Sequence, residues 1–317
     1  MRVSYNFLNN SRASMMTNAI QSQFSTKYKR GLLLVLMAGV LWSTVGLGIR
    51  MIQDANVWQI LLYRSVSLSA FLAIVIYLRS GASPVVAVFS SNLNTHVAGM
   101  SLVAAYSGGI FAIQNTSVAN AMLLFATAPF LAAILGLVVL REKVRAVTWF
   151  AILISLVGIS IMIYDKTNGM ALSGSLAALG SALGFAIFTV ALRHGQAVDM
   201  LPSVFLSGIY AILITGSICA LIDLKFVLDL SDGSIALSMG VFQVGAGLIL
   251  YTVGSKILPA VELTLLSLAE VILGPIWVFL FLDETASVNT LIGGAIVLFA
   301  IAGNALAGAR RKPPMID

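Results

Sequence analysis

The chain has 317 residues, of which 59% are hydrophobic and 9% are charged, whereas roughly 25% of the residues in an ordinary soluble domain are charged. Its mean hydropathy is +1.01. Because a soluble domain needs a largely polar and charged surface, this composition excludes a water-soluble globular fold and indicates a protein embedded in lipid. One cysteine and two histidines exclude a disulfide framework and leave too few soft ligands for a structural zinc site. We expect no metal site and no cofactor.

The predicted elements are membrane helices. A helix needs about 20 apolar residues to cross a bilayer, and the charged residues divide the chain into runs of about this length. The runs are continuously apolar, which favours helices over strands. We predict ten helices, over 31–49, 56–78, two within 80–140 that are joined by a hairpin at 114–117, 146–164, 170–192, 200–222, 233–255, 257–282 and 286–309.

The basic residues between these helices are distributed unequally. With the N-terminus placed inside and the sides alternating, the inner segments hold fourteen Lys and Arg residues and the outer segments hold only Arg50, Lys166 and Lys225. This is the positive-inside bias. It predicts a multi-pass protein of the inner (plasma) membrane whose termini are both cytoplasmic.

Two sequence features recur at nearly the same displacement, which indicates an internal repeat. Gly31–Arg50 and Gly174–Arg193 are runs of twenty residues that end in arginine, 143 residues apart, and Leu140-Arg141-Glu142 matches Leu282-Asp283-Glu284 at a displacement of 142. Five helices therefore repeat as five helices, and the second copy enters the membrane from the opposite side because five is odd. The predicted organisation is a polar cytoplasmic tail, two inverted five-helix repeats and a basic cytoplasmic tail, over 1–30, 31–166, 167–309 and 310–317.

The arrangement of ten helices in two halves, each closing with an apolar helix, a glutamate and a further Gly-rich helix, resembles the EamA-like branch of the drug/metabolite transporter superfamily. The resemblance covers residues 31–309. Where the family often has Glu-Pro in the ninth helix, this chain has Glu270-Val271. The resemblance implies a carrier of metabolites such as amino acids, amines, nucleosides or sugars, and a central pocket lined by the third, fourth, eighth and ninth helices. The motifs that carry it are Ala128-Pro129, Leu140-Arg141-Glu142, Glu270-Val271, Gly274-Pro275 and Leu282-Asp283-Glu284.

The expected function is secondary active transport, with export of a small polar or amphipathic metabolite such as an amino acid or an amine. Inverted repeats supply the two exchangeable conformations that alternating access requires, around a site near the midplane. No nucleotide-binding or hydrolase motif occurs in the sequence, so we expect no enzyme activity and a proton or substrate gradient as the driving force. The expected partners are a small-molecule substrate and the lipid bilayer, with a homodimer left open, and no nucleic acid. The alternatives are a non-transporting scaffold, a lipid-modifying membrane protein and a channel.

Charged side chains inside a membrane are costly, roughly 2.5 to 3.5 kcal/mol at a helix centre, so each one is a candidate site residue. Glu270 lies midway along the ninth helix, with Ser267 one turn before it on the same face. It could bind a substrate ammonium, take up and release a proton, or bond to a neighbouring helix, and we favour a functional role. For Glu262, near the cytoplasmic end of the same helix, we favour a structural role at the helix N-terminus. Arg64 could bind a substrate carboxylate or form a salt bridge with an acidic residue, and we favour the salt bridge.

Uncharged polar and aromatic side chains also occur at mid-helix depth. Each could line a pocket or bond between helices, and the resemblance implies that those of the third, fourth and eighth helices line the central pocket. At a displacement of 142, Glu270 corresponds to Ala128, so a solute should be bound mainly by the second repeat. Gly180 and Gly184, spaced as Gly-x-x-x-Gly, are predicted to allow close helix approach. The remaining substrate-binding candidates are Trp42, Tyr106, Thr127 and Gln243.

Overall fold

The computed structural model describes residues 27–81, 92–164, 169–195, 200–255, 258 and 260–309, and every regular element in these ranges is a helix. Two of the membrane helices are interrupted and one has a π-helical middle. Their bounds are Lys27–Met51, whose last part is α2 (Val45–Met51); α3 (Val57–Ser80); α5 (Leu93–Asn115); α6 (Val118–Phe125) with α7 (Ala128–Val139); α8 (Ala146–Tyr164); α9 (Gly169–His194); α10 (Leu201–Leu221); α11 (Leu230–Ser238) with the π-helix η1 (Met239–Ala246) and α12 (Gly247–Ser255); α13 (Ala260–Leu282); and α14 (Val288–Ala309).

The structure confirms the predicted helices. Within the described ranges, nine helices are long and apolar enough to cross a membrane, and α13, apolar over Leu268–Leu282, is the tenth. The described part of the first helix starts at Lys27, so the last four residues of the predicted N-terminal tail are helical. The rest of that tail, and the predicted tail at 310–317, lie outside the described residues. The chain is an all-helical polytopic membrane protein.

The helices pack in a pattern that recurs between the two halves. The first helix contacts η1 and α13, whereas α9, which is the first helix of the second half, contacts α5, α6 and α7. Each half therefore places its first helix on the third and fourth helices of the other half. The two fifth helices, α8 and α14, pack on each other, and the two second helices, α3 and α10, do the same. This exchange is the packing expected of inverted repeats related by an axis in the membrane plane.

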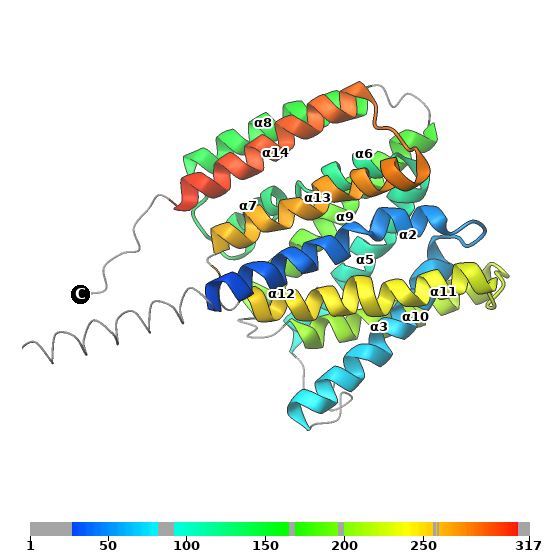
Figure 1. Cartoon of the computed structure of the whole chain (residues 1–317). Helices are drawn as coiled ribbons and strands as arrows, with labels where there is room; N and C mark the ends of the chain where they lie inside the picture. Colours follow the sequence, from blue (N-terminus) through cyan, green and yellow to red (C-terminus); the bar gives the residue numbers. More distant parts are fainter. Residues whose placement is uncertain are drawn as a thin grey trace, which may run out of the picture.

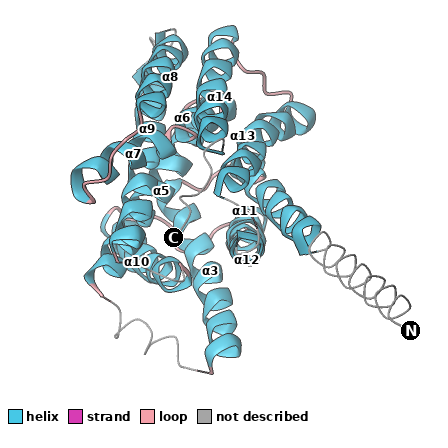
Figure 2. Cartoon of the chain, turned by 90° about the vertical axis from the view of Figure 1, so that its left-hand side faces the viewer, coloured by secondary structure: helices cyan, strands magenta, loops and turns pink. Residues whose placement is uncertain are grey.

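All the membrane helices run between the same two ends of the molecule. The described part of the first helix starts, and α14 ends, at the left of Figure 1, and we call this end the terminal end. The opposite end, where Met51 and Leu282 lie, is called the far end. Figure 2 shows the bundle from the terminal end, with α8 and α14 side by side on one flank, as in Figure 1.

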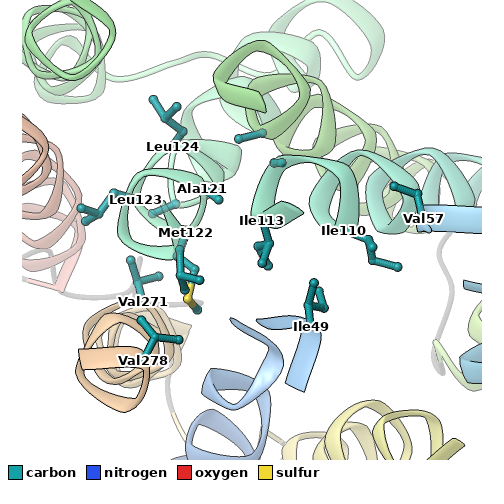
Figure 3. Packing of buried hydrophobic residues seen from close by; sticks show 14 of the residues in the cluster. Ile49, Val57, Ile110, Ile113, Ala121, Met122, Leu123, Leu124, Val271 and Val278 are labelled. Carbon is teal, nitrogen blue, oxygen red and sulfur yellow. The ribbon is translucent and has the colours of Figure 1, made fainter. Parts of the chain in front are cut away.

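Small residues let the helices approach closely, as is usual in membranes. Figure 3 shows Met122 of α6 directed toward α13, where Val271 and Val278 are buried. A Cβ at Gly274 would collide with the Met122 sulfur, so glycine at this position lets α6 and α13 pack together. The fourth helix of one repeat thereby contacts the fourth helix of the other.

The Gly-x-x-x-Gly prediction for α9 is half right. A Cβ at Gly184 would lie 2.8 Å from the carbonyl oxygen of Ser101, so this glycine does bring α9 against α5. Gly180 has no neighbouring atom within 4 Å of the equivalent position. The close approach one turn earlier comes instead from Ser181, whose hydroxyl donates to the Ala105 carbonyl oxygen at 2.6 Å.

Candidate functional site

An ion pair joins the two repeats at the far end. Arg50, in the last turn of α2, donates from Nε to Glu284 Oε2 at 2.7 Å and from Nη2 to Oε1 at 3.3 Å. The same Nη2 donates to the Thr116 carbonyl oxygen at 2.7 Å, and Glu284 accepts from the backbone N–H of Val118 at 2.7 Å. Val118 is the first residue of α6, and a carboxylate is favoured at the N-terminus of a helix. This network connects three helices at the far end of the bundle.

A second ion pair joins the repeats at the terminal end. Arg193 Nη2, in the last turn of α9, donates to Glu142 Oε1 at 2.5 Å. Arg193 is equivalent to Arg50 in the repeat, and Glu142 is equivalent to Glu284. The two pairs are therefore crossed: the arginine of each repeat binds the glutamate of the other, at opposite ends of the molecule.

The two glutamates follow helix endings that have the same local structure. Arg141 and Asp283, which directly precede them, have left-handed backbones with φ of 55° and 52°. The N–H groups of Glu142 and Glu284 each donate to a carbonyl six residues earlier, at 3.2 Å in both cases. The same hydrogen bond and the same left-handed residue occur in both endings, so the sequence match between the two motifs corresponds to one shared local structure.

The two ends are not closed equally. The side chains of Arg50 and Glu284 are 26% and 21% exposed, whereas those of Arg193 and Glu142 are 53% and 43% exposed. At the far end α2 packs against α5. Over the residues that the structure describes, the equivalent helices at the terminal end, α9 and α12, make no comparable contact. The structure therefore has its far end shut more tightly than its terminal end.

Arg64 is buried at the interface of the repeats and stacks on an aromatic ring. The residue is 4% exposed, and its guanidinium carbon lies 4.6 Å from the centre of the Tyr106 ring. The salt bridge that we favoured for Arg64 is absent from the described part of the chain, which contains two salt bridges, both at helix ends. A cation–π contact takes its place.

Trp42 and Gln243 meet where the first helix is interrupted. The helix breaks at Thr44, and the hydroxyls of Ser43 and Thr44 donate to carbonyls three residues earlier, at 2.7 Å each. Gln243, in the π-helix, donates from Nε2 to the Trp42 carbonyl oxygen at 3.4 Å, and its buried Oε1 has no hydrogen-bond partner. The Trp42 ring packs against Tyr251 with the ring centres 5.2 Å apart. The structure thus brings these two candidates together across the repeats.

The other candidates are placed as follows. Glu270 is half-buried on α13, close to Gly39 of the first helix, and its carboxylate has no hydrogen-bond partner among the described residues. The Thr127 hydroxyl donates to the Leu124 carbonyl oxygen at 2.7 Å, at the break between α6 and α7. Ser267 and Glu262 belong to α13, but their side chains lie outside the described part of the structure.

The crossed pairing of Arg50 with Glu284 and of Arg193 with Glu142 was not predicted from the sequence. All four residues occur in the motifs that revealed the repeat. The available signal was their shared displacement: an inverted repeat whose first helix packs on the other half places the end of helix one near the end of helix nine. That inference needed the packing exchange, which the sequence alone does not state.

Comparisons with known proteins agree on the class of protein. The sequence profile of the EamA-like transporter family matches residues 29–164 and again residues 172–306. The chain is 26% identical over 194 residues to the "Uncharacterized transporter YwfM" of Bacillus subtilis (strain 168), covering 60% of this chain and 65% of that protein. It is 27% identical over 206 residues to an "Uncharacterized transporter" of Clostridium kluyveri, covering 61% and 64%. The chain thus spans slightly less than two thirds of these relatives.

A protein of known crystal structure has the same fold. The two structures superpose with a TM-score of 0.64 over 89% of this chain and 99% of that chain, at 18% sequence identity. At this identity the likeness concerns the arrangement of the helices and not the solute.

Proposed function

This chain belongs to the EamA-like transporter family, and we propose that it is a secondary carrier that exports a small polar or amphipathic metabolite by alternating access. The family and the named relatives support a membrane transporter; the mechanism, direction and solute are our own additions. We place the terminal end in the cytoplasm, because the positive-inside bias puts fourteen basic residues there. The far end then faces outward across the inner membrane.

The two crossed ion pairs are the observation that carries this proposal. Alternating access needs two conformations, each closed at one end of a central site. Arg50–Glu284 holds the repeats together at the far end and Arg193–Glu142 holds them at the terminal end. In an alternating cycle the far pair separates when the carrier opens outward, and the terminal pair tightens at the same time. The unequal burial of the pairs corresponds to a state nearer the inward-open one.

The solute site in this proposal lies between these ends. Glu270 serves as the anionic group that binds an ammonium or carries a proton, because its carboxylate lies midway along α13 and has no hydrogen-bond partner among the described residues. The other substrate-binding candidates are Trp42, Gln243, Tyr106, Thr127 and Ser267. A solute or proton gradient drives the cycle.

The test measures the accessibility of a reporter cysteine, Gln243→Cys, in a variant that also carries Cys219→Ala. A membrane-impermeant thiol reagent is applied to right-side-out and to inverted vesicles. Glu284→Gln should increase labelling from the outer side by about five- to tenfold and decrease it from the cytoplasmic side, because loss of the half-buried far-end pair favours the outward-open state. Glu142→Gln should shift labelling in the opposite direction, by less, because that pair is more exposed.

Asp283→Asn is the matched control, since it removes one charge from the same helix ending without breaking the ion pair and since asparagine tolerates a left-handed backbone. It should label as the parent does. If labelling from the two sides is equal and insensitive to both glutamate variants, the bundle is static, and a scaffold or lipid-modifying protein becomes the better description.

The role of Glu270 is tested by solute exchange in proteoliposomes, using radiolabelled amino acids, amines, nucleosides and sugars. Glu270→Gln should abolish exchange of the transported compound without changing the elution volume of the purified protein. The control is Asp54→Asn, which neutralises an exposed acid of the far end. Normal exchange by Glu270→Gln would remove this residue from the mechanism.

A further inference from the structure

A buried guanidinium with unused donors lies between the repeats. Arg64 is seven residues into α3, about 10 Å from its far end at 1.5 Å per residue, and Tyr106 is nine residues before the end of α5, about 14 Å from the same end. Both therefore lie inside the hydrocarbon region, which is about 30 Å thick. Arginine carries five N–H donors, and none of those of Arg64 has an acceptor among the described residues.

The position of Arg64 is fixed from both repeats. The Ser67 hydroxyl donates to the Arg64 carbonyl oxygen at 3.1 Å. Gly240 of η1 packs against the same carbonyl so closely that a Cβ there would collide with it. The Tyr106 ring, on α5, covers the guanidinium. The backbone and one face of the side chain are thus held, while the edges that carry the N–H groups have no partner.

Two of the acidic residues of the far end, Glu284 and Asp232, are already engaged. Glu284 binds Arg50, and Asp232 accepts hydrogen bonds from the backbone N–H groups of 53, 54 and 55. A buried charge without compensation is strongly unfavourable, and arginine stays ionised at any physiological pH. The site therefore suits an anionic ligand better than an internal partner.

The geometry points to a planar anion. A guanidinium stacked on a ring presents its edge, and this edge matches the two oxygens of a carboxylate in a bidentate pair. We propose that Arg64, held over Tyr106, binds the carboxylate of the transported solute. This inference rests on the carrier function proposed above and narrows it: the solute is a carboxylate-bearing compound, and not an amine, a nucleoside or a neutral sugar.

Matched ligands test this assignment. Binding to the purified full-length protein is measured by thermal shift and calorimetry for a panel of α-amino acids, each alongside its amide and its decarboxylated amine. The acids should bind at least about tenfold more tightly than their amides. Arg64→Gln should weaken binding of the acids by about 10- to 100-fold while leaving the affinity for the amides unchanged. Arg79→Gln, an exposed arginine on the same helix, is the control and should bind as the parent does.

A second measurement needs no variant of Arg64. Phenylglyoxal modifies accessible arginines, and mass spectrometry of the peptide that contains Arg64 reports its reaction. The acids should protect Arg64 and the amides should not. Inorganic phosphate is included, because protection by phosphate alone would mean that the site takes phosphate-bearing solutes, which overturns the carboxylate assignment.

The outcomes separate the two proposals. If an amine or a nucleoside is exchanged, and Arg64→Gln exchanges it normally, the carboxylate assignment fails while the carrier stands. If the reporter cysteine shows no alternation, the carrier itself fails, whatever binds at Arg64.

Discussion

Four charged residues at helix ends form ion pairs that depend on how the two repeats pack together. Arg50 and Arg193 end the first helix of each repeat, and Glu142 and Glu284 follow the fourth. Sequence comparison identifies them as equivalent positions but not as partners. They become partners because each first helix packs on the fourth helix of the other repeat. The same exchange makes it impossible to separate the repeats at one end without breaking one ion pair.

A further residue of the far end is expected to matter for stability. Asp232, in the first turn of α11, is 3% exposed and accepts three backbone hydrogen bonds, at 3.1, 2.9 and 3.1 Å, from the loop after α2. Asp232→Ala should destabilise the protein by about 3 kcal/mol, since it leaves these N–H groups unpaired. Thermal unfolding of the detergent-solubilised protein measures the loss. Asp229→Ala removes only an exposed N-cap bond and should cost about 1 kcal/mol; equal losses would contradict the proposed role of Asp232.

At the scale of elements, the helices deviate from ideal geometry where the candidate residues lie. The first helix breaks at Thr44, next to Trp42. The fourth breaks between α6 and α7, where Thr127 lies and Pro129 occupies the first turn of the new helix. The eighth is π-helical around Gln243. Such departures are frequent at functional sites. The sequence gave no sign of the π-helix, which packs against α3.

Gly240 allows η1 to pack closely against α3, and its replacement tests this contact directly. In Gly240→Ala the new methyl group would collide with the Arg64 carbonyl oxygen. We expect a destabilisation of about 2 kcal/mol and faster reaction of Arg64 with phenylglyoxal, because η1 moves away from α3. Gly180→Ala adds the same methyl group in open space and should be neutral or stabilising by up to about 1 kcal/mol. Unfolding of Gly240→Ala at the same temperature as the parent would contradict the proposed role of Gly240 in packing η1 against α3.

At the scale of the whole molecule, the inverted relation of the repeats has an observable consequence. Lys143 and Thr285 are equivalent residues of the two repeats, one position after the paired glutamates. In a background of Cys219→Ala, an impermeant maleimide should label Lys143→Cys only from the cytoplasmic side and Thr285→Cys only from outside. Labelling of both from one side would contradict the inverted topology and, with it, the proposed carrier.

Length, hydrophobicity and charge determined much of this protein without a structure: ten helices, their order, the two repeats and their opposite direction. These properties follow from the cost of placing polar groups in lipid, which acts on each segment separately. Glu270 and Arg64 stood out for the same reason. The structure alone decided which charges meet. Arg64 lies over Tyr106 instead of binding an acid, and the arginine of each repeat binds the glutamate of the other. These pairings depend on how the helices of the two halves pack together. Hydropathy does not predict that packing, because it describes each segment separately.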